Sequence, residues 1–546
     1  MNVPRDRRNG ADLSPGLEVA TAWLNATLKA GADLHADSRE VAPGDGFLAY
    51  AVEGADNRPH IGAALARGAA AVVWQPEHAD LAVLRAVEGA AAHHALPQLD
   101  MLAGPLASAW YGAPSEAMQV IGITGTNGKT SCSHWVAQAL SAAGTPCAIV
   151  GTLGVGLPGQ LTVTGFTTPD APRLQRALAR LRADGAQAVA MEVSSHALHQ
   201  GRSNGVAFDV AVFTNLTQDH LDYHHTMAAY EAAKARLFET PGLRAAVLNR
   251  DDAAGCRLLA QLAADVQPIA YWIDAAPAAP AACADTSSAT SAHRAPLPPR
   301  TAALFARQIR PTARGTAFML DGDWGTAHIE TAIIGAFNVS NLLAVCGALL
   351  AQKMPFDAAC AALARLTPVP GRMQRVSSGP RSNEPLVVVD YAHTPDALEK
   401  ALATLRPVAD ARGGALHCVF GCGGDRDAGK RPLMGAVAAH GADTVVLTSD
   451  NPRSESPMLI IEQIAAGIPA AAHATADSTE RVRQVEDRAR AILQTIRQAA
   501  CADVVLVAGK GHETTQEALG VKQPFSDVDH VQLALAARAA QRDGQS

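Results

Sequence analysis

The stretch MQVIGITGTNGKTS, residues 118–131, decides the fold. It begins with an apolar run that predicts a strand, continues through a glycine-rich loop, and enters a helical pattern from about 130 to 142. The same alternation of apolar strand and helix recurs downstream in QAVAMEVSSH (187–196), DVAVFTNLT (209–217) and AAVLNRDD (245–252). Strands that alternate with helices predict an α/β fold with a parallel, doubly wound sheet.

The loop inside this stretch has the composition of a phosphate site. Its glycines let backbone N–H groups close around phosphate oxygens, and the N-terminus of the following helix adds positive potential. Lys129 is expected to reach the β- and γ-phosphates and Thr130 to reach Mg²⁺. The strict G-x-x-x-x-G-K-[ST] pattern is not met, because Ile123 occupies the first glycine position. An ordinary strand-to-helix turn is the alternative, and the strand and helix on either side favour the phosphate site.

The flanking sequence predicts two further α/β units. Residues 17–110 mix short strand and helix patterns, as in GDGFLAYAV (44–52). Beyond a Ser/Pro/Asn-rich joint at 377–385, four apolar strands each end in a glycine-rich or polar turn. These strands are PLVVVDYAH (385–393), LHCVFGCGG (416–424), DTVVLTSDN (443–451) and DVVLVAGKGHE (503–513). We therefore expect three domains, with bounds 1–113, 114–367 and 368–546.

Two stretches of the middle domain need separate interpretation. Residues 275–300 are mostly Ala, Pro, Ser and Thr, which predicts a flexible surface insertion. The uncharged stretch between Glu330 and Lys353 has the length of a membrane span, but Gly335 and Asn338 interrupt it. A buried strand, turn and helix are therefore expected there, and no membrane span.

Composition excludes several functional classes. The chain of 546 residues carries a net charge of −7 and only 4% aromatic residues, which argues against binding nucleic acid. Its nine cysteines form no C-x-x-C pair, so a zinc site is not expected, and scattered thiols fit a reducing compartment. The N-terminal residues contain no apolar signal segment, so a cytoplasmic location is predicted.

Polar side chains after two strands predict a metal site beside the phosphate loop. Glu192 ends the strand AVAME, and Asp219, His220 and Asp222 follow the strand DVAVF. The carboxyl ends of parallel strands meet at one edge of a sheet, and ligands bind there. Carboxylates at this edge can hold Mg²⁺ directly or through water, whereas the alternative is that they are surface residues of loops.

Taken together, TGTNGKT, MEVSSH, FTNLTQDHLDYH, YEAAK, GAFNVSN, PGRM and DYAHTPDAL resemble the Mur ligase family, in order and over nearly the whole chain. Within the family, GCGGDRDAGKRPLM, SDNPRSESP and AGKGHE resemble the members that add meso-diaminopimelate to UDP-N-acetylmuramoyl-L-alanyl-D-glutamate. The resemblance implies a UDP-binding N-terminal domain, a central P-loop ATPase-like domain and a Rossmann-like C-terminal domain. It also implies ATP and Mg²⁺ as cofactors and peptidoglycan precursor synthesis as the role. We expect a monomer with small-molecule substrates.

The implied reaction activates a carboxylate with ATP, forming an acyl phosphate that the amine of the incoming amino acid attacks. Because a carboxylate and a triphosphate repel, such a site needs cations. The resemblance assigns catalytic roles to Lys129, Lys234, His220 and Arg372. It assigns ATP contacts to Gly125, Thr126, Asn127, Gly128, Lys129, Thr130, Ser131, Asn249, Phe337, Asn338, Asn341, Arg372, Asp390 and His393. It assigns metal contacts to Thr130, Glu192, His220 and Lys234 as a carbamate.

From the residues alone, the same positions have plainer interpretations. Lys234 is a solvated helix lysine, Asn338 is a helix N-cap, and the TTPD of 167–170 is a turn with a cap.

For the UDP substrate the resemblance assigns Ser38, Thr167, Thr168, Ser194, Gln200 and Arg202. For diaminopimelate it assigns Arg426, Asp450, Asn451, Pro452, Arg453, Gly509 and Glu513.

Three departures from the family pattern are visible. Gln374 replaces a common glutamate, HHTM (224–227) replaces a glycine-containing loop, and the insertion at 275–300 is unusual. None of them touches a motif that sets the reaction class. The rival interpretations are another amide ligase of the superfamily, such as a folylpolyglutamate synthase or a different Mur ligase, and a non-catalytic ATP-binding module.

Overall fold

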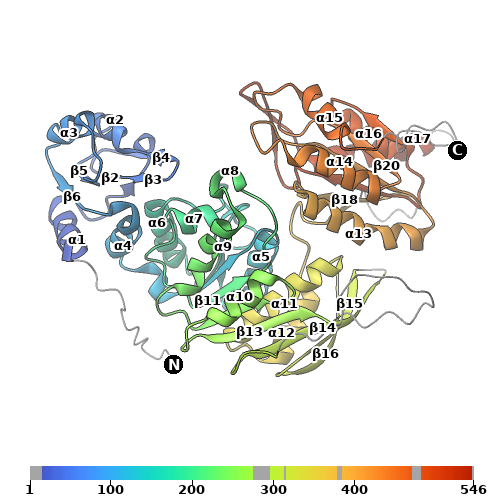
Figure 1. Ribbon diagram of the computed structural model, residues 1–546, viewed down its shortest axis with the longest axis horizontal. Coiled ribbons are helices and arrows are strands. Elements are labelled where there is room, and N and C mark those ends of the chain that lie inside the picture. The colour runs from blue at the N-terminus through green and yellow to red at the C-terminus, as the bar shows by residue number, and fades with distance from the viewer. Residues whose placement is uncertain (1–14, 275–295, 313–314, 378–383, 470–480, 544–546) are drawn as a thin grey trace. The chain divides into compact units, whose positions relative to one another are not determined.

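The computed structural model describes residues 15–274, 296–312, 315–377, 384–469 and 481–543 (Figure 1). The chain divides into two compact units. The first comprises Met1–Gln308, Met319–Ile329 and Ser340–Leu363, and the second comprises Ile309–Phe318, Glu330–Val339 and Ala364–Ser546. Most of the insertion predicted at 275–300 and most of the joint at 377–385 lie outside the described residues.

A small parallel sheet forms the N-terminal part of the first unit. Its strand order is β1-β2-β5-β6, and buried Phe47, Leu48 and Val72 fill its two faces. The elements are α1 Pro15–Thr27, β1 Leu34–His35, η1 Ser38–Glu40, β2 Gly46–Ala49, β3 Ala51–Val52, β4 Ala55–Asp56, η2 Arg58–His60, α2 Ile61–Ala66, β5 Ala71–Trp74, α3 Leu81–Glu88, β6 His93–Ala95, α4 Leu99–Trp110 and η3 Pro114–Ala117. The predicted α/β unit at 17–110 is confirmed.

The central sheet has ten strands in the order β16-β15-β14-β13-β12-β11-β7-β10-β8-β9. Strands β8, β10, β7, β11, β12, β13 and β14 run parallel, which confirms the predicted fold class. The elements are β7 Gln119–Thr124, α5 Lys129–Ala142, β8 Cys147–Gly151, β9 Gly154–Gly156, α6 Ala171–Ala183, β10 Ala188–Glu192, α7 Ser195–His199, β11 Val210–Phe213, α8 Leu221–His224, α9 Met227–Ala235, η4 Arg236–Glu239, β12 Ala245–Asn249, α10 Ala253–Gln261, β13 Gln267–Ile273, β14 Ala302–Pro311, β15 Thr316–Gly322, β16 Gly325–Thr331, α11 Ala336–Ala351 and α12 Phe356–Arg365.

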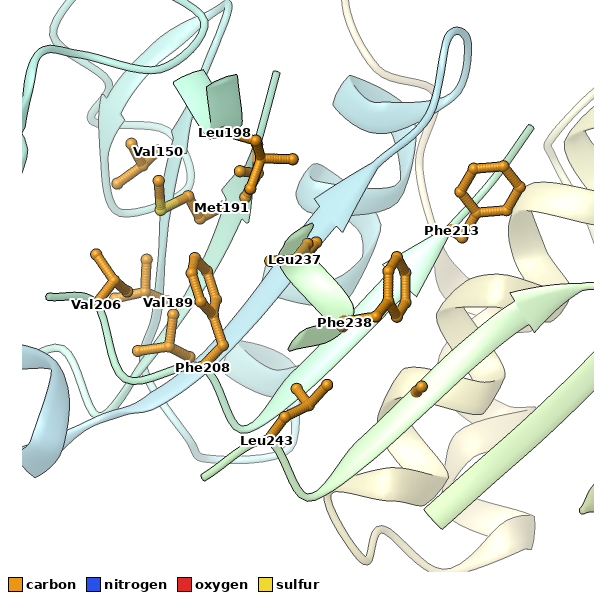
Figure 2. Packing of buried hydrophobic residues seen from close by; sticks show 14 of the residues in the cluster. Val150, Val189, Met191, Leu198, Val206, Phe208, Phe213, Leu237, Phe238 and Leu243 are labelled. Atoms are coloured by element: carbon orange, nitrogen blue, oxygen red, sulfur yellow. The ribbon is translucent and has the colours of Figure 1, made fainter. Parts of the chain in front are cut away.

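Apolar side chains from several strands pack into one cluster on this sheet (Figure 2). Phe208 and Met191 are fully buried there, and the rings of Phe213 and Phe238 meet edge to face at 6.5 Å. Burying each such side chain contributes about 1.5–3 kcal/mol. The cluster therefore holds the strand ends, where the polar side chains lie, in fixed positions.

The second unit is built on a sheet of order β17-β18-β22-β19-β20-β21. β18, β22, β19, β20 and β21 run parallel, and β17 pairs antiparallel with β18. The elements are β17 Gln374–Val376, β18 Leu386–Asp390, α13 Pro395–Arg412, β19 Leu416–Phe420, α14 Lys430–Gly441, β20 Thr444–Leu447, α15 Pro457–Ala465, β21 Val482–Gln484, α16 Arg488–Gln498, β22 Val504–Ala508, β23 Thr515–Ala518, β24 Val521–Pro524 and α17 Asp527–Asp543. All four predicted strands are present.

The uncharged stretch after Glu330 forms the end of β16, a turn and α11, as predicted. Among the described residues, no helix combines the length and the apolar character that crossing a bilayer requires. The cysteines that the structure describes are free thiols.

Candidate functional site

The glycine loop lies between β7 and α5, with Gly128 as the residue before the helix. Gly125 and Gly128 have φ values of 145° and 89°, which residues with a side chain rarely adopt. A Cβ at Gly125 would collide with the Thr214 hydroxyl, and one at Gly128 would collide with Asn341 Oδ1. Only glycine fits at either position, so the loop backbone is open for a phosphate to approach.

The segment after β11 braces this loop. Asn215 accepts hydrogen bonds from the backbone N–H groups of Thr126 (2.8 Å, to its carbonyl) and Asn127 (3.0 Å, to Oδ1). The Thr214 hydroxyl donates to the Asn127 carbonyl at 2.6 Å. The loop is therefore held from one side by side chains that sequence reasoning did not select.

Two lysines converge on a single carbonyl of the loop. The ammonium nitrogens of Lys129 and Lys234 each lie 2.8 Å from the Gly125 oxygen, and Lys129 also contacts the Thr126 carbonyl at 2.8 Å. Lys234 is only 1% exposed, and its Nζ lies 4.4 Å from the centre of the Tyr230 ring. The interpretation of Lys234 as a solvated lysine is therefore wrong.

Burial lowers the pKa of Lys234 well below its ordinary value, and the charge of Lys129 lowers it further, against a smaller opposing effect of Asp219. A lowered pKa increases the fraction of lysine that is a neutral, nucleophilic amine at the phosphate loop.

Glu192 and Thr130 meet as predicted. Glu192 is 1% exposed and accepts a hydrogen bond from the Thr130 hydroxyl at 2.9 Å. Thr152, after β8, donates to it through its N–H at 2.9 Å and its hydroxyl at 3.2 Å. Sequence reasoning missed Thr152, although its place directly after a strand was the available signal.

His220 is more exposed than Glu192 and precedes α8 with a φ of 54°. Its Nε2 lies 3.4 Å from Asp219 Oδ2, and its ring lies 4.8 Å from that of His196. Desolvation lowers the pKa of His220 to about 4, so the imidazole is neutral at pH 7 and able to act as a nitrogen ligand.

The residues present fit a magnesium ion at Thr130 and Glu192. Within the ranges that the structure describes, no group of three or more His, Cys, Asp or Glu side chains is arranged to hold a metal. Mg²⁺ fits such a sparse donor set because it usually takes one or two carboxylates and completes its shell with phosphate oxygens and water.

The residues assigned to ATP are divided between the two compact units. In the first unit, Asn249 at the end of β12 donates to the Thr214 carbonyl at 2.7 Å, and Asn341 of α11 lies against Gly128. Both are therefore beside the phosphate loop, together with Gly125–Ser131.

In the second unit, Arg372 lies 4.3 Å from the centre of the Tyr391 ring, and His393 contacts the Tyr391 carbonyl at 2.9 Å. Asp390 ends β18 and accepts from the N–H groups of Met373 (2.6 Å) and Ala392 (2.8 Å), and burial raises its pKa. Arg372, Asp390 and His393 are thus grouped around Tyr391.

Half-buried Phe337 and buried Asn338 occupy the first turn of α11. Asn338 donates through Nδ2 to the Ile334 carbonyl at 2.8 Å. Because Asn338 lies within the helix, its interpretation as an N-cap is wrong.

Five of the six residues assigned to the UDP substrate form one network with Glu192. The Thr168 hydroxyl donates to the Glu192 carbonyl (2.9 Å) and accepts from the Ser194 N–H (3.1 Å), while Thr167 contacts Thr152 at 3.0 Å. Arg202 donates to the Thr168 carbonyl at 3.1 Å and to Gln200 at 2.8 Å.

Ser38 lies apart, buried at the start of η1. The neighbouring Glu40 is bound by Arg173 of α6 at 2.6 Å, and Gln200 donates to the Glu53 carbonyl at 2.9 Å. These contacts attach the N-terminal sheet to the segment that carries Thr167 and Thr168. Asp170, in the TTPD segment, caps α6 as its plainer interpretation predicted.

The residues assigned to diaminopimelate come from loops after three adjacent strands, β19, β20 and β22. A Cβ at Gly423 would lie 3.0 Å from Arg453 Nη1 and 3.8 Å from Arg426 Cγ, so the two arginines flank one glycine. Arg453 has a φ of 50° and donates to the Gly424 carbonyl at 2.6 Å. A guanidinium group suits a carboxylate, and these loops provide two arginines.

Acidic groups lie in the same set of loops. Burial raises the pKa of Asp450, which adjoins Gly509. The side-chain amide of Asn451 donates to Glu513 at 2.7 Å. The next residue, Pro452, is buried, and its carbonyl accepts a hydrogen bond from the Glu455 N–H at 3.0 Å. The loops therefore carry cationic side chains that can bind the carboxylates of a diamino acid and anionic side chains that can bind its ammonium groups.

Sequence reasoning also missed Lys510, which is fully buried and donates to Asn451 and Glu513 at 3.0 and 2.9 Å. Its position within AGKGHE was the only signal. The residues that sequence reasoning missed, such as Thr152 and Lys510, therefore hold assigned residues in position through hydrogen bonds.

Comparisons with known proteins point to one family. The model of the Mur ligase middle domain matches residues 123–349, and that of the Mur ligase, glutamate ligase domain matches residues 371–511. A UDP-N-acetylmuramoyl-L-alanyl-D-glutamate--2,6-diaminopimelate ligase of Ralstonia nicotianae is 51% identical over 98% of this chain and 99% of that protein. One of the same name from Coxiella burnetii is 44% identical over 96% of this chain and all of the relative.

Solved structures give the same result for the fold. A structure of a UDP-N-acetylmuramoyl-L-alanyl-D-glutamate--2,6-diaminopimelate ligase is 36% identical, covers 93% of this chain and 95% of that one, and has a TM-score of 0.61. A folylpolyglutamate synthase of Mycobacterium tuberculosis, complexed with ADP and AMPPCP, is similar in fold, with 19% identity, 76% and 92% coverage and a TM-score of 0.55.

Proposed function

The chain belongs to the Mur ligase family, and from this membership we propose that it is an ATP-dependent ligase that adds meso-diaminopimelate to UDP-N-acetylmuramoyl-L-alanyl-D-glutamate. The observation that carries the choice of amino acid is that Arg426 and Arg453 flank Gly423 in the same set of loops that contains Asp450 and Glu513. Diaminopimelate differs from lysine by one carboxylate at its far end, and an arginine fork binds a carboxylate through two parallel hydrogen bonds.

The reaction proceeds through an acyl phosphate, and the chain's own residues meet its electrostatic demand. The N–H groups of the loop and the Lys129 ammonium neutralise the triphosphate as it approaches the substrate carboxylate. Arg372 is proposed to add a further cation. The amine of diaminopimelate then attacks the acyl carbon, the amide bond forms and phosphate leaves.

Mg²⁺ would be held by Thr130 and Glu192, with His220 as a further ligand, and it would neutralise charge on the phosphates. The hydrogen-bonded pair of Thr130 and Glu192 supports this assignment, and His220 is included on the family resemblance. The roles proposed for Thr168, Ser194, Gln200 and Arg202 rest on their shared network with Glu192.

Lys234 is proposed to be carbamylated. A neutral amine attacks CO₂, its nitrogen forms the new C–N bond and one proton is released, which leaves an anionic carbamate beside Lys129. The depressed pKa of Lys234 supports this step, because only the unprotonated amine reacts.

We further propose the domain bounds 1–113, 114–367 and 368–546, a monomer and a cytoplasmic location. The two family models, which fall inside the second and third ranges, support the bounds. A non-catalytic ATP-binding module has no need for paired acidic and basic groups at the end of a second sheet.

Phosphate release is the experiment that tests the function. It should require ATP, the UDP-dipeptide and an amino acid together, and it should be faster with meso-diaminopimelate than with lysine. Release with a folate substrate, or a preference for lysine, would contradict the proposal. Omission of each substrate in turn serves as the control.

A further inference from the structure

Lys510 lies in the glycine-rich loop that follows β22, and its side chain is fully buried. Its ammonium donates to Asn451 Oδ1 at 3.0 Å and to Glu513 Oε2 at 2.9 Å. Asn451 Nδ2 donates to the same Glu513 oxygen at 2.7 Å. The three side chains form a closed triangle of hydrogen bonds, and the lysine is its buried vertex.

The triangle leaves Asn451 a single orientation. Its Oδ1 accepts from Lys510 and from the backbone N–H of Glu517 at 3.0 Å. Both partners can only donate, so the amide oxygen must face them and the amide nitrogen must face Glu513. Strand β23 also binds the backbone of the neighbouring loop, because Arg453 N–H donates to the Glu517 carbonyl at 3.0 Å.

The charges around Glu513 depend on the same lysine. Burial raises the pKa of Glu513, but Lys510, together with Asn451 and to a smaller extent His512, outweighs burial, so the pKa lies below its ordinary value. Asp450 and Arg488 also interact electrostatically with Glu513, with opposite signs. Removing Lys510 would leave Glu513 beside Asp450 without its nearest cation.

We propose that Lys510 is a positioning residue for recognition of the incoming amino acid: it holds Asn451 and Glu513 in the arrangement in which the carboxylate of Glu513 receives the substrate's ammonium group. The inference rests on the proposed function, because it assigns that binding to the loops after β19, β20 and β22. Lys510 touches no reacting atom and acts only through its two neighbours.

Lys510→Met tests the proposal, with Lys522→Met, an exposed lysine of β24, as the matched control. We expect the KM for diaminopimelate to rise about 10- to 100-fold, as for the loss of a hydrogen bond to a charged group. The KM for ATP and for the UDP-dipeptide should not change, and neither should kcat. The control variant should behave as wild type.

A pH profile separates positioning from a merely structural role. In Lys510→Met, the ratio of the KM for diaminopimelate to that of wild type should fall as the pH rises, because Glu513, whose pKa the loss of Lys510 raises, regains its charge. Glu513→Gln should raise this KM without that pH dependence. Lys510→Arg, which retains the charge, should lose the pH dependence even where the KM stays raised.

An unchanged KM in a Lys510→Met protein of wild-type melting temperature would overturn the inference, and so would an equal loss in kcat and in every KM. If Lys510→Met does not fold, the KM for diaminopimelate and its pH dependence in Lys510→Arg and Glu513→Gln test the same inference. The proposed function fails separately, namely when the wild-type enzyme prefers lysine to diaminopimelate.

Discussion

Replacing Lys234 with methionine should raise stability at neutral pH while it abolishes activity. The amine is 1% exposed and its pKa is depressed, so the unfolded chain binds one proton more than the folded chain. Between the folded pKa and the ordinary value of 10.5, wild-type stability therefore rises with pH by about 1.4 kcal/mol per unit. Methionine does not titrate. The free energy of unfolding of the variant therefore exceeds that of wild type most at low pH, and the difference shrinks by about 1.4 kcal/mol for each pH unit in this range.

The loss of the hydrogen bond to the Gly125 carbonyl offsets about 1 kcal/mol of this gain. The assay is denaturant unfolding of wild type and Lys234→Met at several pH values in CO₂-free buffer. Lys29→Met, at an exposed lysine, is the control, and its difference from wild type should not vary with pH. Parallel pH dependences for wild type and Lys234→Met would refute the depressed pKa. Undiminished turnover of the variant would refute the carbamate.

Three further predictions concern the other charged groups. Lys129→Ala should lower kcat about 10²- to 10³-fold at saturating ATP, and near-normal phosphate release from the folded variant would contradict the phosphate site. Glu192→Gln removes the negative charge but retains an oxygen that can accept two of the hydrogen bonds. The Mg²⁺ concentration for half-maximal activity should therefore rise at least about tenfold, and an unchanged Mg²⁺ titration would exclude Glu192 as a ligand. Arg453→Ala should reduce the preference for diaminopimelate over lysine about 10²-fold with the KM for ATP unchanged, and an unaltered ratio of kcat/KM values would remove Arg453 from the specificity site.

Periodicity and turn chemistry were enough to predict the strands at the centre of both large sheets. The apolar runs that became β7, β10, β11 and β12 are continuous because both faces of a parallel sheet are covered. The strand pattern of β14–β16 was not recognised, because these strands alternate buried and exposed residues more loosely and follow the low-complexity insertion.

Burial of charged side chains was the property that the residues alone could not predict. Lys234 stands in a helix with an ordinary amphipathic pattern, and only the tertiary structure places it against the phosphate loop. Lys510 and Thr152 were missed for the same reason, since each acts on a neighbour distant in sequence. Asp450 and Glu513 lie in the loops after β20 and β22, and only the resemblance indicated them.

The loops proposed to bind the amino acid belong to one sheet, and this has an evolutionary consequence. Arg426, Arg453, Glu513 and Lys510 all lie in the second compact unit, on adjacent strand ends. The phosphate loop with Lys129 belongs to the other unit. Selection can therefore alter the proposed amino-acid site through the loops of a single sheet while the phosphate loop stays unchanged. For the same reason, exchanging these loops between ligases is a direct route to engineering which amino acid is added.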